Sequence, residues 1–251
     1  MGEKGLVRFL NVILLIGQVL LHFLQGKFYQ RQILEIMLKV GPGSLFPVLL
    51  VAGFAGMIFT VQTARELVDF GAVNSVGSAF AVGFCRELAP ILTACIIAGQ
   101  AGSGFAAEIG AMQITEQIDA LYILRTDPID FLVVPRAIAC CLTLPILIVF
   151  ALVMGTAGGT FAAAIFYEIP PRIFLTSIQN FLTVSDLIII IFKGFIFGVL
   201  VAGISCSWGL TTYGGVKQVG ESATKAVVSC WVWIFISDFF LSLLLFDGLV
   251  F

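Results

Sequence analysis

Five stretches of the chain are almost wholly apolar, and segments rich in polar residues, glycine or proline separate them. A helix needs about 20 consecutive apolar residues to cross the hydrocarbon core of a bilayer. Lipid offers no hydrogen bonds to an open backbone, so each stretch is expected to be helical. The pattern predicts an all-α integral membrane protein with five transmembrane helices, at residues 45–68, 76–99, 137–166, 187–210 and 224–251.

The segment before the first of these stretches has a different pattern. Its polar residues recur every three or four positions, interrupted only at Leu15, and so form a narrow polar stripe along an otherwise apolar helix. This spacing favours an interfacial amphipathic helix over a further span. Gly41, Pro42 and Gly43 then predict a turn. We therefore expect an N-terminal interfacial region at residues 1–40 and a five-span domain at residues 41–251. The stripe consists of Arg8, Asn11, Gln18, His22 and Gln25.

Composition agrees with a membrane protein and narrows the function. The chain is 60% hydrophobic and 11% charged, which is more apolar surface than a soluble domain covers. A net charge of −2 argues against nucleic-acid binding, which needs a clustered basic surface. The 6 cysteines all lie in apolar stretches with no C-x-x-C spacing, and His22 is the single histidine. We expect the cysteines to be small core residues and predict neither a metal site nor a cofactor.

The distribution of basic residues predicts the orientation. Nine of the 13 Lys and Arg residues fall on the side that holds the N-terminus, and the remaining four fall on the other side or within the spans. Basic residues concentrate on the cytoplasmic side of membrane proteins. We therefore expect a cytoplasmic N-terminus and, with five spans, a C-terminus outside.

Four ionisable residues lie inside predicted spans: Arg86, Glu87, Lys193 and Asp238. Charges at that depth cost several kcal/mol by the milder estimates, so they indicate a functional site by default. Neighbours on a helix do not face each other, so Arg86 and Glu87 each need a partner on another helix or in a polar cavity. We expect the four to cluster beside a cavity, with at least one cation free to meet a lipid phosphate. Two structural alternatives stay open: pairs that lock helices together, and a Lys193 that extends to the headgroups.

The segment at about residues 101–130 is acidic and carries apolar residues at helical spacing. Glu108, Glu116 and Asp119 lie in it, and we expect a cytoplasmic element with one buried side. It is either a docking surface or a solvated connection. Gly102, Gly104 and Ala107 also match the loose dinucleotide fingerprint, but that fingerprint requires a preceding strand, and here it follows a predicted span.

Several motifs in this part of the chain resemble the MlaE-type permeases, which are membrane subunits of ATP-driven lipid transporters. The similarity extends from about residue 41 to the C-terminus. Residues 126–128, 139–141 and 214–220 resemble the cyanobacterial and plastid branch most closely. The motifs are R-E-L-A-P at 86–90, A-G-Q-A-G-S at 98–103, A-E-I-G-A-M at 107–112, T-E-Q-I-D-A-L at 115–121 and residues 127–136.

The resemblance implies a homodimer of five-span subunits that works with a separate ABC ATPase and an MCE-domain lipid-binding protein. By family position, Arg86, Glu87, Lys193 and Asp238 belong to the lipid path. The ATPase contact falls at Glu108, Glu116, Gln117 and Asp119. The permease itself is not expected to catalyse a reaction. Gln100 stands where the family usually has arginine, so any contact of that arginine must be made differently here.

Two other functions stay open. An ion-coupled secondary transporter could also place charges in the middle of the membrane, although such folds usually show repeated halves, and none is visible. A non-transporting scaffold for membrane assembly would use the charges only for packing. No transit peptide or cleavage site is recognisable, so we expect a retained N-terminus in a cyanobacterial inner membrane or a plastid inner envelope.

Overall fold

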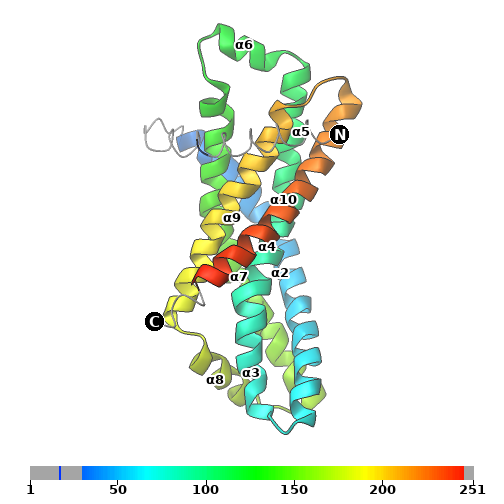
Figure 1. The fold of residues 1–251 in the computed structure, drawn as a ribbon, viewed down its shortest axis with the longest axis vertical. Helices are drawn as coiled ribbons and strands as arrows, with labels where there is room; N and C mark the ends of the chain where they lie inside the picture. The colour runs from blue at the N-terminus through cyan, green and yellow to red at the C-terminus, as the bar shows by residue number, and fades with distance from the viewer. Residues whose placement is uncertain (1–16, 18–29, 246–251) are drawn as a thin grey trace. The chain divides into compact units, whose positions relative to one another are not determined.

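The computed structural model describes residue 17 and residues 30–245, and contains no strand within them. Five helical segments are long and apolar enough to cross a membrane: Gln30–Asp69, Val73–Ile114, Ile129–Tyr167, Val184–Leu210 and Val216–Leu245. These segments confirm the predicted all-α, five-span fold (Figure 1). The predicted interfacial helix falls outside the described residues.

The elements along the chain are α-helices, and 3-10 or π-helical segments lie between some of them. In order, they are α2 (Gln30–Asp69), η1 (Val73–Ser75), α3 (Val76–Phe80), η2 (Ala81–Leu88), α4 (Ala89–Ile97), η3 (Ala98–Gly102), α5 (Ser103–Ile114), α6 (Gln117–Ile123), η4 (Ile129–Val133), α7 (Val134–Tyr167), α8 (Pro171–Phe181), α9 (Val184–Leu210) and α10 (Val216–Leu245).

The predicted turn at Gly41, Pro42 and Gly43 is wrong, because α2 continues through all three residues. In a loop exposed to water, water would bond the backbone N–H and C=O groups that lose their helical partners at proline and glycine. A helix in an apolar environment keeps its remaining backbone bonds, since the alternative is an unpaired group. Val40 and Ser44 are buried on either side of the triplet, so packing holds this part of the helix.

The second span is also longer than predicted. It was expected to end at residue 99, but the helical segment runs on through η3 and α5 to Ile114. The first part of the predicted loop is therefore helix, and the connection to the third span is confined to residues 115–128, which include α6. Gly99 and Gly104 led to the early boundary, because glycine is a weak helix former in isolation.

The chain divides into two compact units. The first contains the described residues within 1–44, 97–144 and 195–236, and the second contains those within 45–96, 145–194 and 237–251. In the first unit, α9 packs closely on α5, since a side chain at Gly209 would meet Ile109. Trp208 on α9 donates a hydrogen bond to Ser229 on α10 at 3.1 Å.

Aromatic rings fill the core of the second unit. Phe80 stacks on Phe84 with centroids 4.8 Å apart, and Phe59 and Phe174 pack edge-on against Phe80 at 6.0 and 5.4 Å. Phe174 comes from α8, so these rings tie α8 to α3. Gly77 permits the close approach, because a side chain there would meet the Phe174 carbonyl and Ser177.

Glycines bring α2 and α7 into backbone contact within the second unit. A β-carbon at Gly56 would collide with the Gly155 backbone, and one at Gly158 would collide with the Gly53 backbone. Small residues at helix crossings let backbones approach closely, and association inside lipid depends on such packing. Gly159, on the same helix, likewise lies against Thr60 and Phe80.

We expect Gly158→Ala to lower the unfolding free energy by about 1–3 kcal/mol, the usual cost of forcing an added methyl into a packed site. Gly220→Ala on α10 is the matched control, because nothing lies within 4 Å of its position. It should be neutral or slightly stabilising. Unfolding in mixed micelles with rising dodecyl sulfate measures both. Equal stability of the two variants would contradict a close α2–α7 crossing.

Candidate functional site

The predicted intramembrane charges meet within the second unit. Arg86 and Glu87 lie in η2, a π-helical segment, while Lys193 is on α9 and Asp238 is on α10. A π-helical turn shifts the direction of the side chains that follow it and often marks a functional site. We call Arg86, Glu87, Asp186, Lys193 and Asp238 the charge cluster.

Lys193 lies at the centre of the charge cluster. Its ammonium group is 2.8 Å from a Glu87 carboxylate oxygen and 2.9 Å from an Asp238 carboxylate oxygen. It also donates to the Ser242 hydroxyl at 2.7 Å, and that hydroxyl donates to Glu87 at 2.8 Å. The Lys193 side chain is 0% exposed, so the alternative that it extends to the headgroups is wrong for this structure.

Pro90 explains a further contact of Lys193. In an α-helix, the Arg86 carbonyl would accept a hydrogen bond from the amide of residue 90, and proline has no amide hydrogen. Lys193 donates to that carbonyl at 3.3 Å. The R-E-L-A-P motif therefore places a residue that cannot donate four positions after the carbonyl that the buried ammonium group contacts.

Arg86 pairs with a residue that the sequence analysis missed. Its guanidinium donates to Asp186 at 2.9 Å, and it lies 5.6 Å from the centre of the Phe181 ring. Asp186 also accepts from the Thr183 amide at 2.8 Å, while the Asp186 amide donates to the Thr183 hydroxyl at 3.3 Å. This reciprocal pattern is a capping box at the start of α9. The T-x-x-D spacing before an apolar stretch was the signal that could have revealed Asp186.

The structure thus brings all four predicted residues together and adds Asp186 and Ser242. The predicted set summed to zero, but the charge cluster has two cations and three carboxylates. Both cations are ion-paired within the described chain, so the expectation of a cation free to meet a phosphate is not met. A phosphate would have to replace a carboxylate at Arg86 or Lys193.

In the first unit, Glu108 on α5 is paired internally. It forms ion pairs with Lys39 on α2 and with Arg136 on α7, the second at 3.1 Å. Arg136 is itself 8% exposed and donates to the Leu132 carbonyl at 2.7 Å. Gln100 and Lys39 line one cavity of about 240 Å³ beside Glu108. A cation is therefore present next to Gln100 even though the expected arginine is missing.

Glu116, Gln117 and Asp119 lie at or in α6 and are exposed. Glu116 has a positive φ of 60°, a left-handed conformation that turns the chain sharply between α5 and α6. Ile118 is buried at 3%, which gives α6 the single buried side that was predicted. The end of α6 exposes three large apolar side chains: Tyr122, Ile123 and Leu124.

The dinucleotide-like spacing has no structural support. Gly102, Gly104 and Ala107 lie in the continuous helical segment of η3 and α5, and no strand precedes them within the described residues. Cys85, Cys140, Cys206 and Cys230 are buried, as predicted for small core residues, and Cys95 and Cys141 are partly buried.

Comparison with known proteins gives consistent matches. The family model described as "Permease MlaE" matches residues 33–244. A probable ABC transporter permease protein of Synechocystis is 55% identical over 241 residues, which cover 96% of this chain and 92% of that protein. The chloroplastic protein TRIGALACTOSYLDIACYLGLYCEROL 1 of Arabidopsis thaliana is 44% identical over 246 residues, covering 98% and 70%. A probable ABC transporter permease protein of Rickettsia typhi is 37% identical over 218 residues, covering 87% and 84%.

Proposed function

The chain belongs to the MlaE permease family and is a multi-span ABC transporter permease with cyanobacterial and chloroplast relatives; from that premise we propose that it forms the membrane path for a lipid. The observation that carries the proposal is the charge cluster, a buried polar site among apolar spans. A lipid needs an apolar wall for its acyl chains and a few polar groups for its headgroup. The name of the Arabidopsis relative includes the name of a galactolipid, which supports a lipid substrate.

In this proposal, two copies of the chain enclose the path, a separate ATPase hydrolyses ATP, and an MCE-domain protein exchanges lipid with the complex. ATP binding and hydrolysis would bias the dimer between two packings, since a ligand shifts an equilibrium through its different affinity for the two states. The paired cations support a gated exchange. A headgroup phosphate would displace Asp186 or Glu87 from its cation when the packing changes, and the carboxylate would return when the lipid leaves.

We place the ATPase contact at α6. The exposed Tyr122, Ile123 and Leu124 offer an apolar anchor, and Glu116 and Asp119 beside them would face basic residues of the partner. Aromatic anchors in the centre of an interface with charges at its rim are typical of protein docking. Glu108 would support this contact indirectly, because its ion pairs hold α5 to α2 and α7.

Charge reversal at α6 should weaken the ATPase contact. We expect Glu116→Lys with Asp119→Lys to reduce co-purification of the ATPase and its stimulated hydrolysis by about tenfold, because like charges then face each other across the interface. Asp69→Lys is the control, since this exposed carboxylate lies at the end of α2 far along the chain from α6. Wild-type yield and stimulation in the double variant would exclude α6 as the docking site.

The function itself is tested by reconstitution. The permease, co-purified with its ATPase and MCE-domain partner, is placed in proteoliposomes, and transfer of a fluorescent phospholipid to acceptor vesicles is followed. We expect transfer that requires hydrolysable ATP. Transfer driven by an ion gradient without ATP would favour the secondary-transporter alternative, and no transfer under any condition would favour the scaffold.

A further inference from the structure

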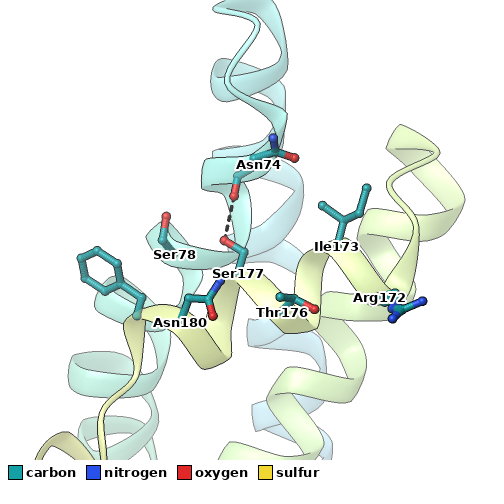
Figure 2. A pocket seen from close by; sticks show the side chains of 8 residues that line it. Asn74, Ser78, Arg172, Ile173, Thr176, Ser177 and Asn180 are labelled. Carbon is teal, nitrogen blue, oxygen red and sulfur yellow. Dashed lines mark hydrogen bonds between the residues drawn. The ribbon is translucent and has the colours of Figure 1, made fainter.

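An open cavity of about 410 Å³, lined mostly by residues with polar side chains, lies where α8 packs on η1 and α3 in the second unit (Figure 2). Its volume falls within the usual range for small-ligand sites. Arg172, Thr176 and Asn180 approach it from α8 at a spacing of four residues, so they share one stripe of that helix. Asn74 and Ser78 line it from η1 and α3.

Several donors in this cavity have no protein partner. Within the described chain, the side chains of Asn74, Thr176 and Asn180 make no hydrogen bond, and Arg172 makes no ion pair. The Ser177 hydroxyl donates to the backbone carbonyl of Asn74 at 2.7 Å, as Figure 2 shows, and this hydrogen bond joins α8 to η1. None of the described residues that line the cavity has a carboxylate, so a metal ion is a poor occupant. The lining fits a ligand with hydrogen-bond-accepting oxygens.

The surroundings of the cavity are amphiphilic. α8 lies between the segments Ile129–Tyr167 and Val184–Leu210, outside both candidate spans, and Asn74 lies at the start of Val73–Ile114. Exposed apolar side chains border the polar stripe: Ile173 at 40%, Leu175 at 39% and Phe181 at 46%. Polar groups bordered by apolar ones at the end of a span match a molecule with a polar head and an apolar tail.

One aromatic ring connects the cavity to the charge cluster. Phe181 lines the cavity, and the Arg86 guanidinium lies 5.6 Å from the centre of the same ring. The next residues along the chain lead to Asp186, which accepts from the Arg86 guanidinium and from the Thr183 hydroxyl. The Phe181 side chain therefore borders both the cavity and Arg86.

We infer that this cavity is a headgroup-binding site for a membrane lipid at the end of the path, with Phe181 bordering both the cavity and Arg86. The inference rests on the proposed function. The phosphate or sugar oxygens of the headgroup would accept hydrogen bonds from Arg172 and Asn180 on α8 and from Asn74 on η1. The acyl chains would lie along Ile173 and Leu175.

Photolabelling of the full complex tests this site. Wild-type complex is reconstituted in phosphatidylcholine vesicles that contain either photoreactive phosphatidylglycerol or a photoreactive galactosyl diacylglycerol, and labelled peptides are mapped by mass spectrometry. We expect the peptide that carries α8 to be labelled by at least one of the two lipids. Arg172→Gln with Asn180→Ala should reduce that labelling about tenfold, the loss expected for one charge-assisted hydrogen bond. Gln179→Ala, an exposed α8 residue outside the cavity, should label as wild type.

Besides absent labelling of α8 in the wild-type complex, three outcomes would overturn the inference: labelling of the double variant at the wild-type level, loss of wild-type labelling in the presence of inorganic phosphate, and loss of the MCE-domain partner from the double variant with labelling unchanged. The second would indicate a free-anion site, and the third a protein-docking face. ATP-dependent transfer by the same vesicles separates the two proposals. Transfer without labelling at α8 contradicts the cavity site alone, whereas labelling without transfer contradicts the proposed function alone.

Discussion

Lys193→Met is expected to lower the unfolding free energy by about 3–5 kcal/mol, because it leaves the buried Asp238 carboxylate and the partly buried Glu87 carboxylate without their shared cation. The ammonium group contacts Glu87 and Asp238 at 2.8 and 2.9 Å, and the Lys193 and Asp238 side chains are 0% and 7% exposed. Unfolding of the purified protein in mixed micelles measures this change in unfolding free energy. Lys225→Met is the control, because its pair with Glu221 is about half exposed and such pairs contribute about 1 kcal/mol at most.

Neutralising the whole group should recover most of that loss. The triple variant Glu87→Gln, Lys193→Met and Asp238→Asn removes the carboxylates together with the cation, and replacing all members of a buried ionic group is often close to neutral. Ser242 can still donate to Gln at position 87 as it does to Glu87. A triple variant no more stable than Lys193→Met would mean that the cost comes from lost packing around Lys193 and not from unpaired charge.

The same triple variant separates structure from transport. Its stability is restored, so any remaining defect in lipid transfer per folded complex reflects the charges themselves. We expect transfer to stay low, since no cation remains on α9 for a headgroup to reach when the packing changes. Transfer at the wild-type level would mean that the Lys193 contacts only hold the helices together, and would contradict their role in the lipid path.

The membrane architecture could be predicted because the length of an apolar stretch is a strong signal that no single residue decides. The ends of the helices could not be predicted, since Gly41, Pro42 and Gly43 in α2 and Gly99 in η3 break a helix only where water can replace the lost backbone bonds. Their neighbours Val40 and Ser44 are buried, and that packing is not visible in the sequence.

The charge cluster was predicted in part for a similar reason. Charges inside apolar stretches are visible at once, which is how Arg86 and Lys193 were found. Asp186 stands two residues after the start of α9, at the edge of its span, and reads as an ordinary helix-capping residue. Its second role, as the partner of Arg86 at 2.9 Å, depends on how α9 and η2 meet. Glu108 shows the converse, because an acidic residue in an apparent loop proved to be paired with Lys39 and Arg136.

The Arg86 and Asp186 pair should show a coupling energy of about 2–3 kcal/mol in a double-mutant cycle. The variants are Arg86→Met, Asp186→Asn and both together, since asparagine keeps an oxygen for the Thr183 amide and so preserves the capping box. The side chains are 20% and 6% exposed, so each is costly to leave without the other. Partial hydration of Arg86 makes the expected loss smaller than that for Lys193. Unfolding in mixed micelles measures all four proteins.

A cycle of Arg86→Met with Asp69→Asn is the control, because Asp69 is exposed at the end of α2 and these two changes should add to within about 0.5 kcal/mol. Coupling near zero for Arg86 with Asp186 would contradict the ion pair.

Coupling at the expected size would establish the ion pair, and transport measurements then test whether Arg86 also binds headgroups. If headgroups displace Asp186 from Arg86, Arg86→Met should lower lipid transfer per folded complex while Asp186→Asn, which retains the cation, should slow lipid release instead. Normal transfer and release in both variants would mean that this pair only fastens η2 to the start of α9.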